Sequence, residues 1–387
     1  MNNNNQKSGP LTGFTFIEIE GIGPGPFAGM MLSDMGAEVI VVERAMGKAD
    51  ASTDFGATDI LKRGKRSIAV DLKSNEGKEL VLKLVAKADG LIEGMRPGVM
   101  ERLGLGPDVC LKANPALIYG RMTGWGQTGP MSQAAGHDLN YIGLSGALWY
   151  AGRPGDAPVA PPTLAGDIGG GATYLVIGLL AGVLNAKNTG VGQVVDANIV
   201  DGSANMMNLI LTMVATKSAT YTRGQSLLDG PHWFDSYKTS DDKAITFGPL
   251  EVKFYKIMLE ALGLQDDEDF KEQYKPKLWP SQKAKLAAII ANNTQEHWNQ
   301  VFDGLDACYA PVLSPEDAAK HAHNEARGYY FEKDGMLQAS AAPRFEQTPS
   351  NDKGDIVDRG ANSKDILLEL GLPEAEITDM FNQGTVK

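Results

Sequence analysis

Cysteine and histidine are scarce in this sequence of 387 residues, which holds two cysteines and five histidines. Cys110 and Cys308 are too few for a disulfide framework and lack the spacing of metal ligands. His321 and His323 lie close together, but no partnering Cys or His group completes a zinc site. The sequence therefore predicts neither a structural disulfide nor a bound metal.

Long apolar runs are also missing. The longest, residues 172–184, falls short of the roughly 20 residues that cross a bilayer, and the polar residues 1–9 do not resemble a secretion signal. The net charge of −12 repels nucleic acid and anionic membranes. We therefore expect a cytoplasmic protein that binds no nucleic acid and does not insert stably into a membrane.

Strand and helix patterns alternate through the first half of the sequence. Strands are expected at 14–20, 38–43, 67–71, 90–93 and 114–120. Helices are expected at 27–35, where Gly36 ends the helix, and at 76–88. This alternation is typical of an open, mostly parallel α/β sheet.

The second half changes in character. Residues 172–184 are apolar nearly all round, which predicts a buried helix. Residues 225–315 carry charged amphipathic stretches and a hairpin-like turn at 240–243, which indicate a second, smaller domain. A last helix is expected at 364–370, ended by Gly371 and Pro373.

A glycine-rich loop, Gly23-x-Gly25-x-x-Ala28, fits the dinucleotide fingerprint, and Glu43 stands where a ribose acceptor would be expected. Pro24 and Pro26 argue against that use, because each removes a backbone N–H that would face a pyrophosphate. A turn that packs a helix on the sheet is the better interpretation.

Basic residues gather at 62–66, Lys-Arg-Gly-Lys-Arg, with Arg44, Lys73 and Arg102 nearby in the sequence. Arg and Lys are the side chains that recognise phosphate. A solvated loop is the alternative interpretation.

His137 and Asp167 are candidates for acid–base chemistry. His137 begins a probable helix after a glycine-rich loop, and Asp167 precedes the apolar helix at 172–184. A helix N-terminus stabilises a carboxylate and can aim N–H groups at an oxyanion. An imidazole and a tuned carboxyl group suit proton transfer on opposite faces of a thioester enolate. The alternatives are an N-cap for Asp167 and an ordinary polar residue for His137.

Several ordered motifs together resemble the class III coenzyme A transferase family, and within it the racemase branch. The matching stretches are residues 21–28, 34–39, 93–104, 124–130, 136–141, 190–197 and 306–312. The resemblance implies a Rossmann-like large domain with a smaller α+β domain, in an interlocked homodimer whose sites lie between the large domain of one chain and the small domain of the other.

The resemblance also implies domain boundaries. Residues 1–10 are then a tail, 11–200 and 336–387 the two parts of the large domain, 231–313 the small domain, and 201–230 and 314–335 the linkers.

Site residues are implied residue by residue. His137 and Asp167 correspond to the two acid–base groups, and Glu251 of Gly248-Pro-Leu-Glu251 to the residue that supports the histidine. The coenzyme A (CoA) phosphates and adenine correspond to Arg44, Arg63, Lys73 and Arg102, and the thioester end to Gly136, Asp138 and Tyr141. The implied partner is an acyl-CoA thioester, with no cofactor beyond its CoA moiety.

The implied reaction interconverts (R)- and (S)-2-methylacyl-CoA through an enolate. The transferase branch generally lacks the histidine and uses the aspartate as a nucleophile, so CoA transfer through Asp167 is the alternative. A non-catalytic acyl-CoA-binding protein is a second alternative. The sequence departs from the racemase pattern at Thr163, where Asn is common, and at Pro231-His232-Trp233. We expect both departures to line the acyl pocket.

Overall fold

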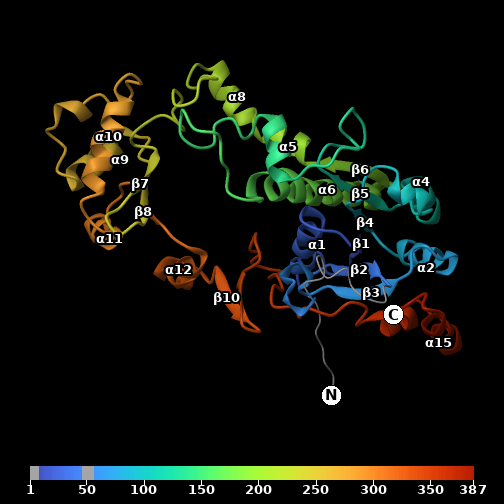
Figure 1. The fold of residues 1–387 in the computed structure, drawn as a ribbon. Helices are drawn as coiled ribbons and strands as arrows, with labels where there is room; N and C mark the ends of the chain where they lie inside the picture. Colours follow the sequence, from blue (N-terminus) through green and yellow to red (C-terminus); the bar gives the residue numbers. More distant parts are fainter. Residues whose placement is uncertain (1–7, 46–55) are drawn as a thin grey trace. The chain divides into compact units, whose positions relative to one another are not determined.

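The computed structural model describes residues 8–45 and 56–387, which form two compact units (Figure 1). The first unit combines Met1–Gly146, Pro161–Met206 and Tyr330–Lys387, and the second combines Ala147–Ala160 with Met207–Tyr329. Residues 147–160, placed in the large domain from the sequence, thus belong to the second unit. The residues predicted as linkers are divided between the units.

A parallel sheet of six strands forms the centre of the first unit, in the order β3-β2-β1-β4-β5-β6. The strands are β1 (Thr15–Ile19), β2 (Glu38–Arg44), β3 (Arg66–Val70), β4 (Gly90–Glu93), β5 (Ile118–Thr123) and β6 (Gln193–Asn198). The predicted parallel α/β sheet is confirmed. The strand expected at 114–120 begins later, because Asn114 makes a turn in which its side chain donates to the carbonyls of Val85 and Ala88.

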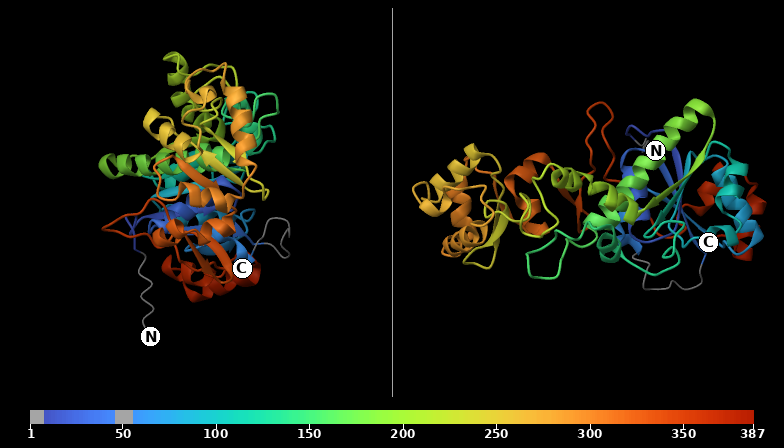
Figure 2. Two further views of the ribbon diagram at one scale, coloured as in Figure 1. Left: turned by 90° about the vertical axis from the view of Figure 1, so that its left-hand side faces the viewer. Right: turned by 90° about the horizontal axis from the view of Figure 1, so that it is seen from above.

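Helices cover both faces of this sheet (Figure 2). On one face, α2 (Asn75–Val85), α14 (Ser363–Glu369) and α15 (Glu374–Gln383) contribute Leu80, Leu367 and Ile377 to one buried cluster. On the other, α1 (Pro24–Asp34) and α6 (Thr173–Thr189) contribute Leu32 and Leu175 to a second. Shorter helices are α3 (Val99–Arg102), α4 (Pro107–Ala113), α5 (Asp138–Ser145) and α7 (Ile199–Met206).

The helices differ from those expected in their boundaries and in number. Helix α1 starts at Pro24 and not at residue 27, because a proline fits the first helical position, where its missing N–H has no partner to lose. The helix expected at 364–370 is confirmed as α14, but α15 follows directly after Pro373 and was not predicted.

The helix expected at 172–184 is longer and less buried than predicted. A π-helical segment, Leu164–Ala172, precedes α6, and the combined stretch is long and apolar enough to cross a membrane by length and composition. The side of α6 that carries Leu175 and Leu179 is buried against the sheet. Ile177 and Leu184 are 58% and 68% exposed, so the expectation of burial on all sides was wrong.

The second unit is built on a three-stranded antiparallel sheet, β7-β8-β9. Its strands are β7 (Asp235–Lys238), β8 (Ala244–Phe247) and β9 (Tyr309–Val312), and its helices include α8 (Asn208–Ala215), α9 (Val252–Ala261), α10 (Trp279–Ile290), α11 (Gln295–Phe302), α12 (Pro315–Lys320) and α13 (Ala322–Arg327). The predicted turn at 240–243 joins β7 to β8. Trp233, Phe247 and Trp298 belong to the buried core of this unit. A hairpin of β10 (Tyr330–Lys333) and β11 (Met336–Ala339) returns the chain to the first unit.

Candidate active site

A cavity of about 360 Å³ lies at the carboxyl ends of β1, β4 and β5 in the first unit. Its walls include Gly23 and Pro24 at the start of α1, residues 94–97 after β4, and both His137 and Asp167. The sheet order reverses between β1 and β4, and open α/β sheets bind ligands at such a point. The fold therefore brings two side chains separated by 30 positions to one ligand-sized hollow.

His137 is the N-cap residue of α5 and is exposed. Its backbone N–H donates to the side chain of Asn140 at 3.0 Å, which fixes the start of the helix. Gly136 contacts Tyr141, whose hydroxyl donates to the Gly136 carbonyl, and the Tyr141 ring meets Trp125 edge-on at 4.7 Å. The loop before His137 is thus held by aromatic packing, and His137 itself forms part of the cavity wall.

Asp167 lies in the π-helical segment that precedes α6. Burial raises the pKa of its carboxyl group to about 6; the nearby Asp138 carboxylate adds to this rise and His137 opposes it. A carboxyl group with a raised pKa keeps its proton closer to neutral pH, so Asp167 can act as an acid as well as a base, as proton transfer in both directions requires.

Asp138 connects the two candidate groups. It is the first residue of α5, directly after His137, and its Oδ1 accepts the backbone N–H of Asp167 at 2.8 Å. Gly166 makes this approach possible, since a Cβ there would lie 2.3 Å from Oδ1 of Asp138. The bond uses the Asp167 N–H, and the Ile168 N–H donates to the Thr163 carbonyl. Neither N–H is therefore free to stabilise an oxyanion, contrary to the expectation from the sequence.

The glycine run 169–171 lets the π-helical segment pack closely on α7. A Cβ on Gly202 would lie 1.8 Å from the carbonyl oxygen of Gly170, and one on Gly170 would lie 2.8 Å from the Ser203 nitrogen. Backbone packs directly on backbone here, so the position of Asp167 is set by glycines on both elements.

The basic residues 62–66 are paired within the chain. Each of the four basic residues forms an ion pair with a carboxylate at 2.8 Å or less. The pairs are Lys62 with Glu43, Arg63 with Asp34, Lys65 with Glu18 and Arg66 with Glu369. Three of the four carboxylates, those of Glu43, Asp34 and Glu18, are buried. The cluster therefore holds the sheet and helices together. The interpretation of this cluster as a phosphate-binding loop does not fit its geometry.

Arg63 is buried in an ion pair. Its side chain is 3% exposed, it binds both oxygens of Asp34, and it donates to the Ala339 carbonyl at 2.8 Å. The resemblance implied a phosphate ligand, and in this structure Arg63 is instead a buried structural ion pair. Arg44, Lys73 and Arg102 are exposed and stay predictions.

Arg96 lines the cavity and was not singled out from the sequence. It is exposed, and it lies in the Glu93-Gly-Met-Arg-Pro-Gly stretch that follows β4. A position just after the carboxyl end of a parallel strand is the signal that would have identified it.

Glu43 cannot serve as a ribose acceptor. It is fully buried, receives hydrogen bonds from Lys62 and Ser67, and has no exposed oxygen to offer a ligand. A dinucleotide site at the Gly23 loop would therefore lack its ribose acceptor, in addition to the two backbone N–H groups that the prolines remove.

The departures from the racemase pattern have structural explanations. Thr163 adopts a left-handed conformation at φ 60°, which Asn tolerates better than a β-branched residue does. His232 and Trp233 are fully buried in the core of the second unit, so the expectation that they line an acyl pocket was wrong. Burial also lowers the pKa of His232 to about 3, so this histidine is neutral.

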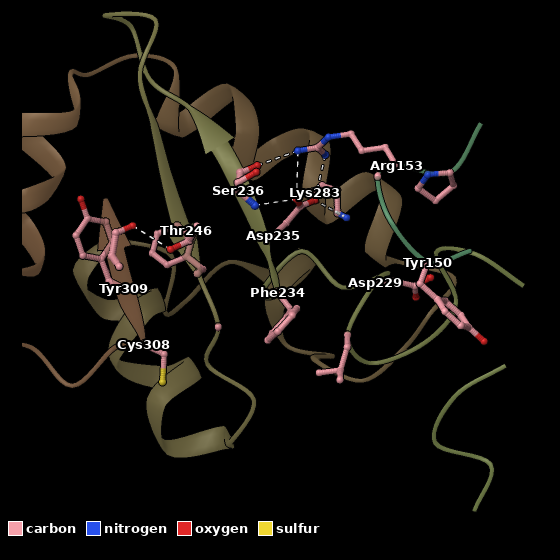
Figure 3. Close-up of a pocket in the computed structure, with 16 residues that line it drawn as sticks. Tyr150, Arg153, Asp229, Phe234, Asp235, Ser236, Thr246, Lys283, Cys308 and Tyr309 are labelled. Atoms are coloured by element: carbon pink, nitrogen blue, oxygen red, sulfur yellow. Dashed lines mark hydrogen bonds and ion pairs between the residues drawn. The ribbon is translucent and has the colours of Figure 1, made fainter. Parts of the chain in front are cut away.

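The second unit contains a larger cavity, of about 670 Å³, between its sheet and the segment 150–154 (Figure 3). Arg153 and Lys283 both bind Asp235 on its wall, at 3.0 and 2.6 Å, and Phe234 points into it. Its titratable wall residues include Asp229, Lys283 and Cys308, whereas His137 and Asp167 both lie in the cavity of the first unit. Glu251 also belongs to this unit, exposed at the N-terminal end of α9.

Comparison with known proteins places these features in context. Residues 11–355 match CoA-transferase family III. Alpha-methylacyl-CoA racemase of Mus musculus is 38% identical over 97% of both chains, and that of Homo sapiens is 36% identical over 97% of both. The crystal structure of a CAIB/BAIF family protein from Brucella suis superposes with a TM-score of 0.79 at 24% identity, covering 94% of this chain and all of the other.

The burial of Arg63 leads to a prediction about stability. Arg63→Ala leaves the Asp34 carboxylate buried without its partner, so we expect it to lower the free energy of unfolding by about 3–5 kcal/mol. Arg102→Ala, at an exposed position, is the control and should change it by no more than about 0.5 kcal/mol. Urea unfolding measures both; a stable Arg63→Ala protein that only binds CoA more weakly would contradict the structural role.

Proposed function

Because the chain belongs to CoA-transferase family III, we propose that it is a racemase that interconverts (R)- and (S)-2-methylacyl-CoA thioesters. Two observations support this proposal together. The racemase relatives match nearly the full length of the chain. In addition, an imidazole and a carboxyl group with a raised pKa line one cavity of the first unit.

The proposed reaction moves one proton at the carbon next to the thioester carbonyl. One member of the His137–Asp167 pair removes the α-proton, and the electron pair of the broken C–H bond delocalises into the carbonyl to form an enolate. The other member then donates its proton to the opposite face of the same carbon. The pair exchanges its protonation states in the process, and the substrate gains or loses no atoms.

The single observation that carries the proposal is the joint placement of His137 and Asp167. They come from different elements, α5 and the π-helical segment, and the hydrogen bond from the Asp167 N–H to Asp138 ties these elements together. Preorganised acid and base groups accelerate such a step without further rearrangement of the protein.

We propose in addition that the reaction uses no cofactor beyond the CoA of its substrate, because proton transfer requires no electron acceptor. The exposed Arg44, Arg96, Lys73 and Arg102 supply the positive charge for the CoA phosphates in this proposal. We further propose a cytoplasmic location.

A homodimer is the proposed assembly. Ile177 and Leu184 on α6 are 58% and 68% exposed, and Leu209 on α8 is 66% exposed. Helix α8 has no buried residue, although its sequence NLILTMVA is largely apolar. Apolar surface of this kind marks protein–protein contacts, and the role proposed for Glu251 belongs to this assembly.

The proton-transfer chemistry is tested by α-proton exchange. In deuterated water, a 2-methylacyl-CoA should gain α-deuterium without any acceptor acid, and Asp167→Asn or His137→Ala should lower the exchange rate by at least about 100-fold. The measurement is mass spectrometry of the recovered thioester, with circular dichroism to show that each variant is folded. Formation of a new CoA thioester only when an acceptor acid is added, without α-exchange, supports CoA transfer instead. Thioester binding with neither reaction supports a binding protein.

The raised pKa of Asp167 predicts the pH dependence. The pair works with one proton between its members, and a second proton leaves no base. Since the pKa of Asp167 is about 6, we expect kcat, measured at saturating substrate, to fall below about pH 6, about tenfold per pH unit. A dephospho-CoA thioester removes the titrating 3′-phosphate of CoA as a competing cause. A limb near pH 4, where an ordinary aspartate titrates, would contradict the role.

The assembly is tested by mass in solution. Light scattering should give about twice the 41.4 kDa of one chain, and Ile177→Asp with Leu184→Asp should reduce this mass or make the protein aggregate. Phe381→Asp is the matched control, because Phe381 is also an exposed apolar residue but lies on α15, across the sheet from α6. A monomeric wild-type protein would overturn the proposal.

A further inference from the structure

Glu93 is a fully buried carboxyl group that the proposed proton transfer does not use. It is the last residue of β4, directly before the segment 94–97 that lines the cavity with His137 and Asp167. A buried carboxylate costs free energy unless it is paired and hydrogen-bonded. The hydrogen bonds of Glu93 must therefore compensate for its burial.

Both oxygens of Glu93 are engaged. Oε2 accepts the backbone N–H of Met95 at 2.7 Å, which fixes the first turn of the 94–97 segment. Oε1 accepts Nε of Arg121 at 2.9 Å from the neighbouring strand β5. The carboxylate thus joins the cavity wall to the body of the sheet.

The network continues beyond the sheet. Arg121 donates through Nη1 to Glu101 at 2.8 Å, and Glu101 lies in the short helix α3 beside Arg102. One carboxylate is thereby connected to two stretches that carry cations proposed to meet CoA: Arg96 in the 94–97 segment, and Arg102 in α3.

We propose that Glu93 is a positioning residue for CoA binding, whose carboxylate holds the 94–97 segment directly and α3 through Arg121 and Glu101. The inference rests on the proposed function for the identity of the ligand. It goes beyond that function in assigning affinity to a residue that touches neither the ligand nor the reacting atoms.

The ionisation of Glu93 makes this role dependent on pH. Burial raises the pKa of its carboxyl group to about 7, against the opposing effects of the Met95 N–H and Arg121, with Glu101 adding to the rise. Tyr119, on β5, also interacts electrostatically with Glu93. Protonation removes the charge that strengthens both hydrogen bonds. The segment is therefore held firmly above pH 7 and loosened as the pH falls through that value.

Calorimetric titration with dephospho-CoA tests the inference, because this ligand lacks the 3′-phosphate that itself titrates near pH 6. Wild-type affinity should fall as the pH drops from 8 to 6. Glu93→Gln, similar in shape but uncharged, should bind about 5- to 20-fold more weakly at pH 8 and show little change between pH 8 and 6. Glu93→Asp should restore part of the pH dependence.

Asp34→Asn is the matched control, because Asp34 is likewise a buried carboxylate paired with an arginine but does not line the cavity. It should lower thermal stability while it keeps the wild-type affinity and pH profile. Equal pH profiles for wild type and Glu93→Gln, with both proteins folded, would overturn the positioning role. A wild-type protein that binds no dephospho-CoA or CoA would instead overturn the proposed function.

Discussion

The hydrogen bond between the Asp138 carboxylate and the Asp167 backbone N–H is the interaction on which the candidate site depends. Asp138 follows His137 directly, so this bond at 2.8 Å fixes the start of α5 against the π-helical segment. The same carboxylate contributes to the raised pKa of Asp167. One residue thus fixes the relative position of the two candidate groups and adds to the effect of burial on the pKa of Asp167.

Glycine makes this contact possible. A side chain at Gly166 would displace Asp138, and one at Gly202 would separate α7 from the π-helical segment. Glycine loses more conformational entropy on folding than other residues do, and the close packing of backbone on backbone must offset this loss. The glycine-rich run after Leu164 therefore serves close packing. Asp167 is held by the elements packed around it, and the segment has no side-chain cap.

Charge in the first unit serves mainly to connect elements. Lys65 with Glu18 and Arg63 with Asp34 are buried pairs that tie the residues just before β3 to strand β1 and to helix α1. Removing one partner of such a pair leaves a buried charge uncompensated, which is far more costly than losing an exposed pair. The exposed cations, among them Arg44 and Arg96, are the ones left for an anionic ligand.

The sequence by itself determined the architecture of the first unit. Segments rich in β-branched residues alternate with segments of helical periodicity, and this alternation is typical of a parallel α/β sheet. It also identified the motifs around His137 and Asp167, because local patterns and family resemblance are both readable along one dimension. Only the tertiary structure decided which charges are available, since Arg63 and Arg102 look alike in sequence but differ in burial. It also decided that α6 keeps an apolar face exposed and that Glu93 lies behind the cavity wall. These properties arise from contacts between residues distant in the chain, which no local pattern encodes.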